Sequence, residues 1–153
     1  MTAGLIVCVA ALAVATAGGF TWRQRNGRMR PVAVRQPVAA LAATGQAAPS
    51  QAPDLTAAEI GGPLGPRATL LQFSSAFCAP CRATRRVLAE VAGMTDGVAH
   101  LEIDAESHLE LVRRLDVRRT PTVFVLGPAG RIAHRASGQP RKADVIAALG
   151  EVT

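Results

Sequence analysis

Short hydrophobic runs alternate with amphipathic stretches along residues 54–153. The hydrophobic runs are typical of strands, and the stretches between them carry apolar side chains at helical spacing, as Leu109, Val112 and Leu115 do. A turn from Gly127 to Gly130 predicts that the last two strands form a hairpin. The order β-α-β-α-β-β-α indicates one α/β domain. The predicted strands are residues 69–74, 98–104, 117–126 and 131–136, and the predicted helices are residues 82–92, 107–115 and 141–149.

Residues 1–22 show a different pattern, with no charged side chain between Ala3 and Trp22. An uncharged helix of 20 residues is about 30 Å long, which is roughly the thickness of the hydrocarbon core of a bilayer. We therefore predict a single transmembrane helix over residues 1–22. The alternative is a cleaved signal peptide, because Ala13-Val14-Ala15 and Ala15-Thr16-Ala17 resemble cleavage sites. We favour the anchor, because a basic stretch before the hydrophobic run is absent and arginines follow it.

The net charge of +6 is concentrated in residues 23–53. Five of the 17 basic residues and none of the 11 acidic ones precede residue 54, so residues 54–153 carry 12 basic against 11 acidic residues, a net charge of +1. The positive-inside rule then places the domain in the cytoplasm. No aromatic residues are interleaved with basic ones, so we expect no nucleic-acid partner. Residues 23–53 are therefore predicted to be a basic juxtamembrane segment followed, from Pro31 to Pro53, by a flexible linker rich in Ala, Pro, Gln and Val.

The sequence Cys78-Ala79-Pro80-Cys81 lies where a predicted strand gives way to a predicted helix. A thiol at the start of a helix faces unpaired N–H groups and the positive end of the helix dipole, which lower its pKa and make it the attacking group. Cys81 follows about one turn later and is placed to resolve a mixed disulfide. Pro80 suits the first helical turn. This spacing indicates thiol–disulfide exchange.

Half of a zinc site has the same cysteine spacing, so metal binding is an alternative interpretation. Such a site needs two further ligands, whereas His100, His108 and His134 are scattered over separate predicted elements. We expect no metal. Cys8 lies in the predicted membrane helix, where we interpret it as a small apolar residue facing lipid.

Several segments in order resemble the thioredoxin family over roughly residues 54–151. The resemblance implies a three-layer α/β/α sandwich with a mixed central sheet, preceded here by the predicted transmembrane helix. It also implies that Cys78 is the nucleophile and Cys81 the resolving thiol, with Ala79 and Pro80 tuning the reduction potential. The segments that carry the resemblance are FSSAFCAPCR at 73–82, VAHLEID at 98–104, VRRTPTVF at 117–124 and Gly138.

The resemblance further implies a substrate groove beside the dithiol. Thr120-Pro121 matches the family's cis-proline turn, which presents backbone groups to a substrate strand, and X-Pro is the type of bond for which cis is cheap. Phe77 and the backbone around Thr120 would border the groove, and Gly138 would leave room for the incoming chain.

Three positions depart from the family pattern. Phe77 replaces the usual Trp, and Ala79 replaces the usual Gly. Gln72 stands where the family buries an acidic residue beneath the dithiol. An amide cannot accept the proton of Cys81 as a carboxylate can, so we expect slower resolution than in a typical thioredoxin.

The sequence thus predicts a membrane-tethered thiol–disulfide oxidoreductase that reduces protein disulfides. No bound cofactor is needed, and electrons would come from a separate reductase or a membrane electron donor. If the domain is instead extracytoplasmic, the same residues would serve an oxidase, an isomerase or a reductant for cytochrome maturation. A non-catalytic binding module with this fold is the alternative from another class.

Overall fold

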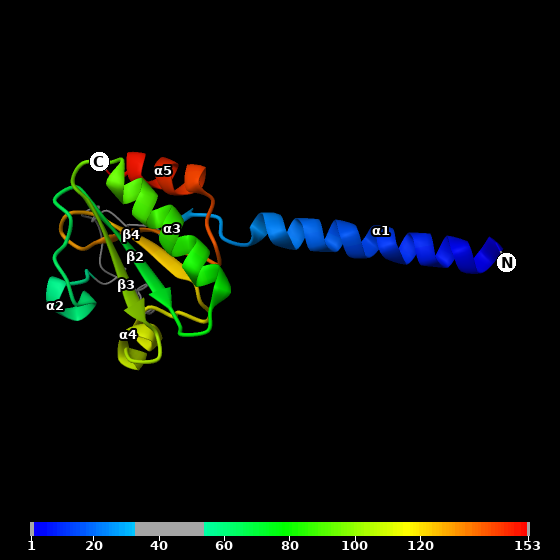
Figure 1. Ribbon diagram of the computed structural model, residues 1–153, viewed down its shortest axis with the longest axis horizontal. Coiled ribbons are helices and arrows are strands. Elements are labelled where there is room, and N and C mark those ends of the chain that lie inside the picture. Colours follow the sequence, from blue (N-terminus) through cyan, green and yellow to red (C-terminus); the bar gives the residue numbers. More distant parts are fainter. Residues whose placement is uncertain (1, 33–53, 153) are drawn as a thin grey trace, which may run out of the picture.

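The computed structural model describes residues 2–32 and 54–152. Over these ranges the chain forms helices and strands in the order predicted for the domain, together with three elements nearer the N-terminus (Figure 1). The elements are α1 (Thr2–Arg25), β1 (Arg30–Pro31), α2 (Ala57–Ile60), β2 (Ala68–Ser74), α3 (Ala79–Gly93), β3 (Val98–Asp104), α4 (Leu109–Arg114), β4 (Thr122–Leu126), β5 (Ile132–Ser137) and α5 (Lys142–Gly150).

The strands form one mixed sheet in the order β1-β5-β4-β2-β3. β2 pairs in parallel with β3 and antiparallel with β4, while β5 pairs antiparallel with both β4 and β1. The parallel register sets Gln72 beside Glu102 on the neighbouring strand. All seven residues of β2 are buried, as expected of a central strand with both faces covered. The mixed central sheet predicted from the sequence is confirmed.

Helices cover both faces of the sheet, so the domain has the predicted three layers. α3 and α5 lie on one face, as Figure 1 shows, and their apolar residues pack against Leu70, Val123 and Val125 of the sheet. On the other face, Leu71, Phe73 and Phe124 pack against Ile60 of α2 and residues of α4. Neighbouring residues of β2 point to opposite faces, which makes this strand the centre of both cores.

Two element boundaries differ from the prediction, and both lie next to the dithiol. α3 begins at Ala79 rather than at residue 82, because Cys78 caps the helix and Pro80 occupies its first turn. β4 begins at Thr122 rather than at residue 117, because residues 118–121 form a loop that ends in the cis Thr120–Pro121 bond. The remaining domain boundaries agree within two residues.

The N-terminal residues were predicted to form a transmembrane helix and a linker. Residues Thr2–Arg25 are helical, and over the two described ranges no helix has the length and apolar character that a membrane crossing requires. Arg30 was predicted to lie in a basic juxtamembrane segment and Pro31 to begin the linker, whereas Arg30–Pro31 joins the sheet as β1. The Gly27 N–H donates to Ser137 O at 2.9 Å and the Val32 N–H to Ala133 O at 2.7 Å. The rest of the predicted linker, residues 33–53, lies outside the described residues.

Leu71 tests the assignment of the core, because its side chain is fully buried on β2. We expect Leu71→Ala to lower the free energy of unfolding of the full chain by about 2–5 kcal/mol, because it removes buried apolar surface and leaves a cavity. Denaturant unfolding followed by circular dichroism measures this change. Leu109→Ala is the matched control, since Leu109 is 52% exposed. A cost at Leu71 as small as the cost at Leu109 would contradict the assignment.

Candidate active site

Cys78 and Cys81 form a disulfide at the N-terminus of α3, with their Cα atoms 5.2 Å apart. Cys78 is the N-cap residue, and its Sγ accepts a hydrogen bond from the Cys81 N–H at 3.1 Å. Cys78 is 8% exposed and Cys81 only 1% exposed. The two sulfurs are therefore unequal in access, with Cys78 nearer to solvent.

The local sequence explains why Cys78 caps the helix. β2 ends at Ser74, a short turn follows, and the Cys78 N–H donates to Ser75 O at 3.3 Å. Pro80 has no N–H to leave unpaired and its φ suits the first turn. The free N–H groups and the positive end of the helix dipole then face the sulfur of Cys78. This environment favours a thiolate at Cys78 when the disulfide is reduced.

Gln72 lies beneath the dithiol and is fully buried. Its Nε2 donates to the carbonyl oxygen of Cys81 at 3.0 Å and to Glu102 Oε1 at 3.3 Å. Its own Oε1 is buried and has no hydrogen-bond partner among the residues that the structure describes. The side chain predicted to replace a buried acid is thus in place below Cys81, where it binds the backbone and cannot act as a base.

Glu102 connects Gln72 to Arg85 of α3. Arg85 Nε lies 2.5 Å from Glu102 Oε2, and Arg85 Nη2 donates to Glu102 Oε1 at 2.8 Å. Partial burial raises the pKa of Glu102, but hydrogen bonds from Arg85 and Ser74 and the charge of Arg85 outweigh it and hold the pKa below its ordinary value. The carboxylate is therefore ionised at neutral pH and paired with a guanidinium.

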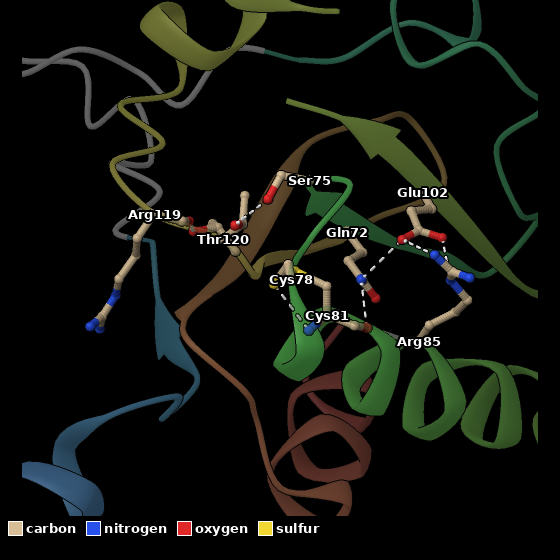
Figure 2. The surroundings of a disulfide bond; sticks show 9 residues. Gln72, Ser75, Cys78, Cys81, Arg85, Glu102, Arg119 and Thr120 are labelled. Atoms are coloured by element: carbon tan, nitrogen blue, oxygen red, sulfur yellow. Dashed lines mark hydrogen bonds and ion pairs between the residues drawn. A yellow bond between two sulfur atoms is a disulfide. The ribbon is translucent and has the colours of Figure 1, made fainter. Parts of the chain in front are cut away.

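In Figure 2, the cis-proline loop at Thr120 lies on the side of the disulfide opposite to Gln72 and Glu102. The Thr120–Pro121 bond is cis, and Thr120 Oγ1 lies 3.1 Å from Ser75 Oγ, a hydrogen bond that ties this loop to the turn before Cys78. The Gly138 N–H donates to Pro121 O at 2.7 Å. The structure thus brings together the dithiol turn, Thr120, Pro121 and Gly138, residues that are far apart in the sequence.

Gly138 has a different neighbour from the one expected. Its φ is +95°, and a Cβ atom there would lie 2.4 Å from Asn26 Oδ1. The positive φ favours glycine at this position, and a larger residue would also require the Asn26 side chain to move. The space beside Gly138, predicted to admit a substrate chain, adjoins Asn26 of the segment that leads into β1.

A pocket of about 510 Å³ opens beside the two sulfurs. Phe77, which precedes the dithiol, is fully exposed, and Ala79 and Pro80 are also exposed.

The sequence analysis did not assign Arg85 or Glu102 to the site. Arg85 could have been found from the sequence, because it lies four residues after Cys81 on the same helix. Glu102 could not, because only the pairing of β2 with β3 places it beside Gln72. The pocket is lined by Ser74, Ser75, Ala76, Cys78, Cys81, Arg82, Arg85, Glu102 and Asp104.

Metal binding was the alternative interpretation of the cysteine pair. Across residues 2–32 and 54–152, no three His, Cys, Asp or Glu side chains gather in a way that would hold a metal ion. His100 is partly buried on β3, and this burial lowers its pKa.

The fold and the site define a class of protein: a three-layer α/β domain with a helix-capping Cys-x-x-Cys disulfide beside a cis-proline loop. The sequence profile of the thioredoxin family matches residues 65–151, more than half of the chain. The chain belongs to the thioredoxin family, whose members are generally thiol–disulfide oxidoreductases.

Two curated relatives are thioredoxins of rice, Oryza sativa subsp. japonica. Thioredoxin H2-1 is 35% identical over 69 residues, which are 45% of this chain and 49% of the relative. Thioredoxin H5 is 34% identical over 60 residues, which are 39% of this chain and 44% of the relative. The chain thus spans about half the length of the curated relatives it matches.

Solved structures of thioredoxins resemble the domain. Chloroplastic thioredoxin z has a TM-score of 0.51 and 26% identity, with 57% of this chain and 79% of that chain covered. A mutant thioredoxin from Halobacterium salinarum has a TM-score of 0.52 and 22% identity, with 57% and 75% covered, and supports the fold alone.

Gln72 generates a prediction about the resolving step. We expect Gln72→Asp to speed attack by Cys81 on a mixed disulfide at Cys78, because the introduced carboxylate is a base and its burial near Glu102 raises its pKa toward neutrality. Stopped-flow release of thionitrobenzoate from Cys78 after one equivalent of Ellman's reagent measures the rate. Gln72→Asn is the matched control, because it has the same size but no basic carboxylate. Equal rates in the two variants would contradict the prediction.

Proposed function

We propose that this protein is a thiol–disulfide oxidoreductase that reduces disulfides in protein substrates. The observation that carries the proposal is the position of Cys78 as N-cap of α3, with Sγ 3.1 Å from the Cys81 N–H. A thiolate at this place is stabilised by the helix terminus and is the nucleophile. Cys81, more deeply buried one turn later, is the resolving thiol.

Reduction proceeds by two exchanges of sulfur bonds. The Cys78 thiolate attacks one sulfur of the substrate disulfide, that bond breaks, and the leaving thiolate takes a proton. Cys81 then loses its proton and attacks Cys78 Sγ, which breaks the mixed disulfide and releases the second substrate thiolate to be protonated. Two electrons pass from the dithiol to the substrate, and the Cys78–Cys81 disulfide is the oxidised product.

The substrate segment binds between Phe77 and the Thr120–Pro121 loop in this proposal. Phe77 is fully exposed and offers apolar contact area, while the backbone beside Pro121 can pair with an extended chain. Ala79 and Pro80 contact the substrate from the helix side, and Gly138 supports the loop through its hydrogen bond to Pro121 O. The next turnover requires two electrons from a separate reductase or a membrane electron donor.

Insulin reduction tests the proposed activity in the full chain with dithiothreitol as electron donor. We expect turnover in the wild type and no turnover above background in Cys78→Ser. Reduced Cys81→Ser, freed of dithiothreitol and mixed with insulin, should accumulate a mixed disulfide, because resolution by Cys81 is then blocked. Precipitation of the insulin B chain and non-reducing electrophoresis measure these outcomes. An inactive but folded wild type would contradict the enzyme and favour a non-catalytic binding module.

Attachment to a membrane through residues 1–22, with the domain on the cytoplasmic side, is the localisation we propose. The sequence supports this localisation. Five arginines and no acidic residue lie between the uncharged run Ala3–Trp22 and residue 54. Reduction is the default direction in that compartment. An extracytoplasmic domain would instead favour an oxidase, an isomerase or a reductant for cytochrome maturation.

Labelling of Cys78 tests this localisation. In a Cys8→Ser, Cys81→Ser variant one thiol remains, and we expect a membrane-impermeant maleimide to label it in spheroplasts only after lysis. Sedimentation of the protein with salt-washed membranes reports the attachment. Labelling before lysis would place the domain on the extracytoplasmic side of the membrane. A protein that stays in the supernatant would contradict the membrane anchor.

A further inference from the structure

A continuous series of contacts connects the surface of α3 to the backbone of the resolving cysteine. Arg85 binds Glu102 through two nitrogens, at 2.5 and 2.8 Å. Glu102 Oε1 also accepts from Gln72 Nε2 at 3.3 Å, and the same amide group donates to Cys81 O at 3.0 Å. The two hydrogens of that amide match these two acceptors.

The fold makes this arrangement specific to the dithiol. Gln72 and Glu102 are paired in the register of β2 and β3, and Arg85 follows Cys81 by one turn of α3. Figure 2 shows Arg85 reaching back from the helix to Glu102, with the Gln72 side chain between Glu102 and Cys81. Helix, sheet and dithiol therefore meet through these side chains.

The Arg85–Glu102 pair borders the pocket that opens beside the dithiol. Cys78, Cys81, Arg85 and Glu102 line the same pocket, and the Glu102 side chain is only 22% exposed. Charges at such a partly buried site are screened less than charges in water. Arg82 and Asp104 also line the pocket.

We propose that Arg85 and Glu102 are positioning residues that set the reduction potential of the Cys78–Cys81 couple. The pair is neutral as a unit, so the negative charge of Glu102 is cancelled beside the dithiol while its oxygen still holds Gln72. This inference rests on the proposed function only in that the couple exchanges two electrons: reduction breaks the Cys78–Cys81 bond, adds two electrons and binds up to two protons.

Removing the charge of Glu102 and removing the charge of Arg85 should shift the reduction equilibrium of the Cys78–Cys81 couple in opposite directions. Glu102→Gln keeps an oxygen that can accept from Gln72 but leaves Arg85 uncompensated, which stabilises the Cys78 thiolate and favours the reduced form. Arg85→Gln leaves the Glu102 carboxylate unpaired, which destabilises the thiolate and favours the disulfide. We expect the equilibrium constant for reduction to change about three- to tenfold in each direction, and tenfold corresponds to about 30 mV.

Equilibration of the full chain with mixtures of reduced and oxidised glutathione at pH 7 measures the constant. The variants are made in a Cys8→Ser background, and alkylation followed by electrophoresis counts free thiols. Arg85→Lys keeps the charge and should restore a value within about twofold of wild type. Arg113→Gln is the matched control, because Arg113 pairs with Glu110 on α4, outside the pocket.

Opposite shifts in the two variants, with Arg113→Gln unchanged, would support the proposal. Shifts in the same direction, or none, would overturn it, and a loss of thermal stability without opposite shifts would mean that the pair is only structural. The double variant Arg85→Gln, Glu102→Gln should return toward wild type. Because no protein substrate is used, a wild type inactive on insulin would overturn the proposed function without altering this result.

Discussion

The junction between β2 and α3 is the constraint on which the site depends. β2 is hydrogen-bonded on both edges and buried on both faces, so its C-terminal end has a fixed position in the domain. The chain leaves that end at Ser74 and enters α3 at Ala79. Cys78 must therefore occupy the N-cap, where its sulfur faces unpaired N–H groups. The reactivity of the dithiol is a consequence of the sheet that holds this junction.

A polar side chain in the apolar core follows from the same geometry. Alternation along β2 turns Gln72 toward the same face as Leu70, under the first turn of α3. The Nε2 group of this buried amide donates to the Cys81 carbonyl and to Glu102, whereas its Oε1 has no partner among the described residues. Glu102 in turn avoids the cost of an isolated buried charge by pairing with Arg85. Gln72 Nε2, Glu102 and Arg85 thus form one series of contacts beneath the dithiol.

The edge of the sheet shows how the N-terminal segment joins the domain. β5 would expose its free edge, and β1 covers part of it through antiparallel pairing. Gly27 makes this approach feasible: its φ is +80°, and a Cβ atom there would lie on Gln139 O. The same segment brings Asn26 to Gly138, so part of the chain outside the family match adjoins the predicted substrate groove.

The sequence by itself determined the order of elements from β2 to α5, because hydrophobic periodicity and turn residues are local signals. It also determined the dithiol and its place before a helix, since both depend on neighbouring residues. Only the tertiary structure decided that Arg85 and Glu102 belong to the site and that residues 26–32 pack on β5. Strand order and register arise from contacts between distant residues, which a single sequence does not reveal. A two-residue strand such as β1 has no periodicity of its own, and the partner alone makes it a strand.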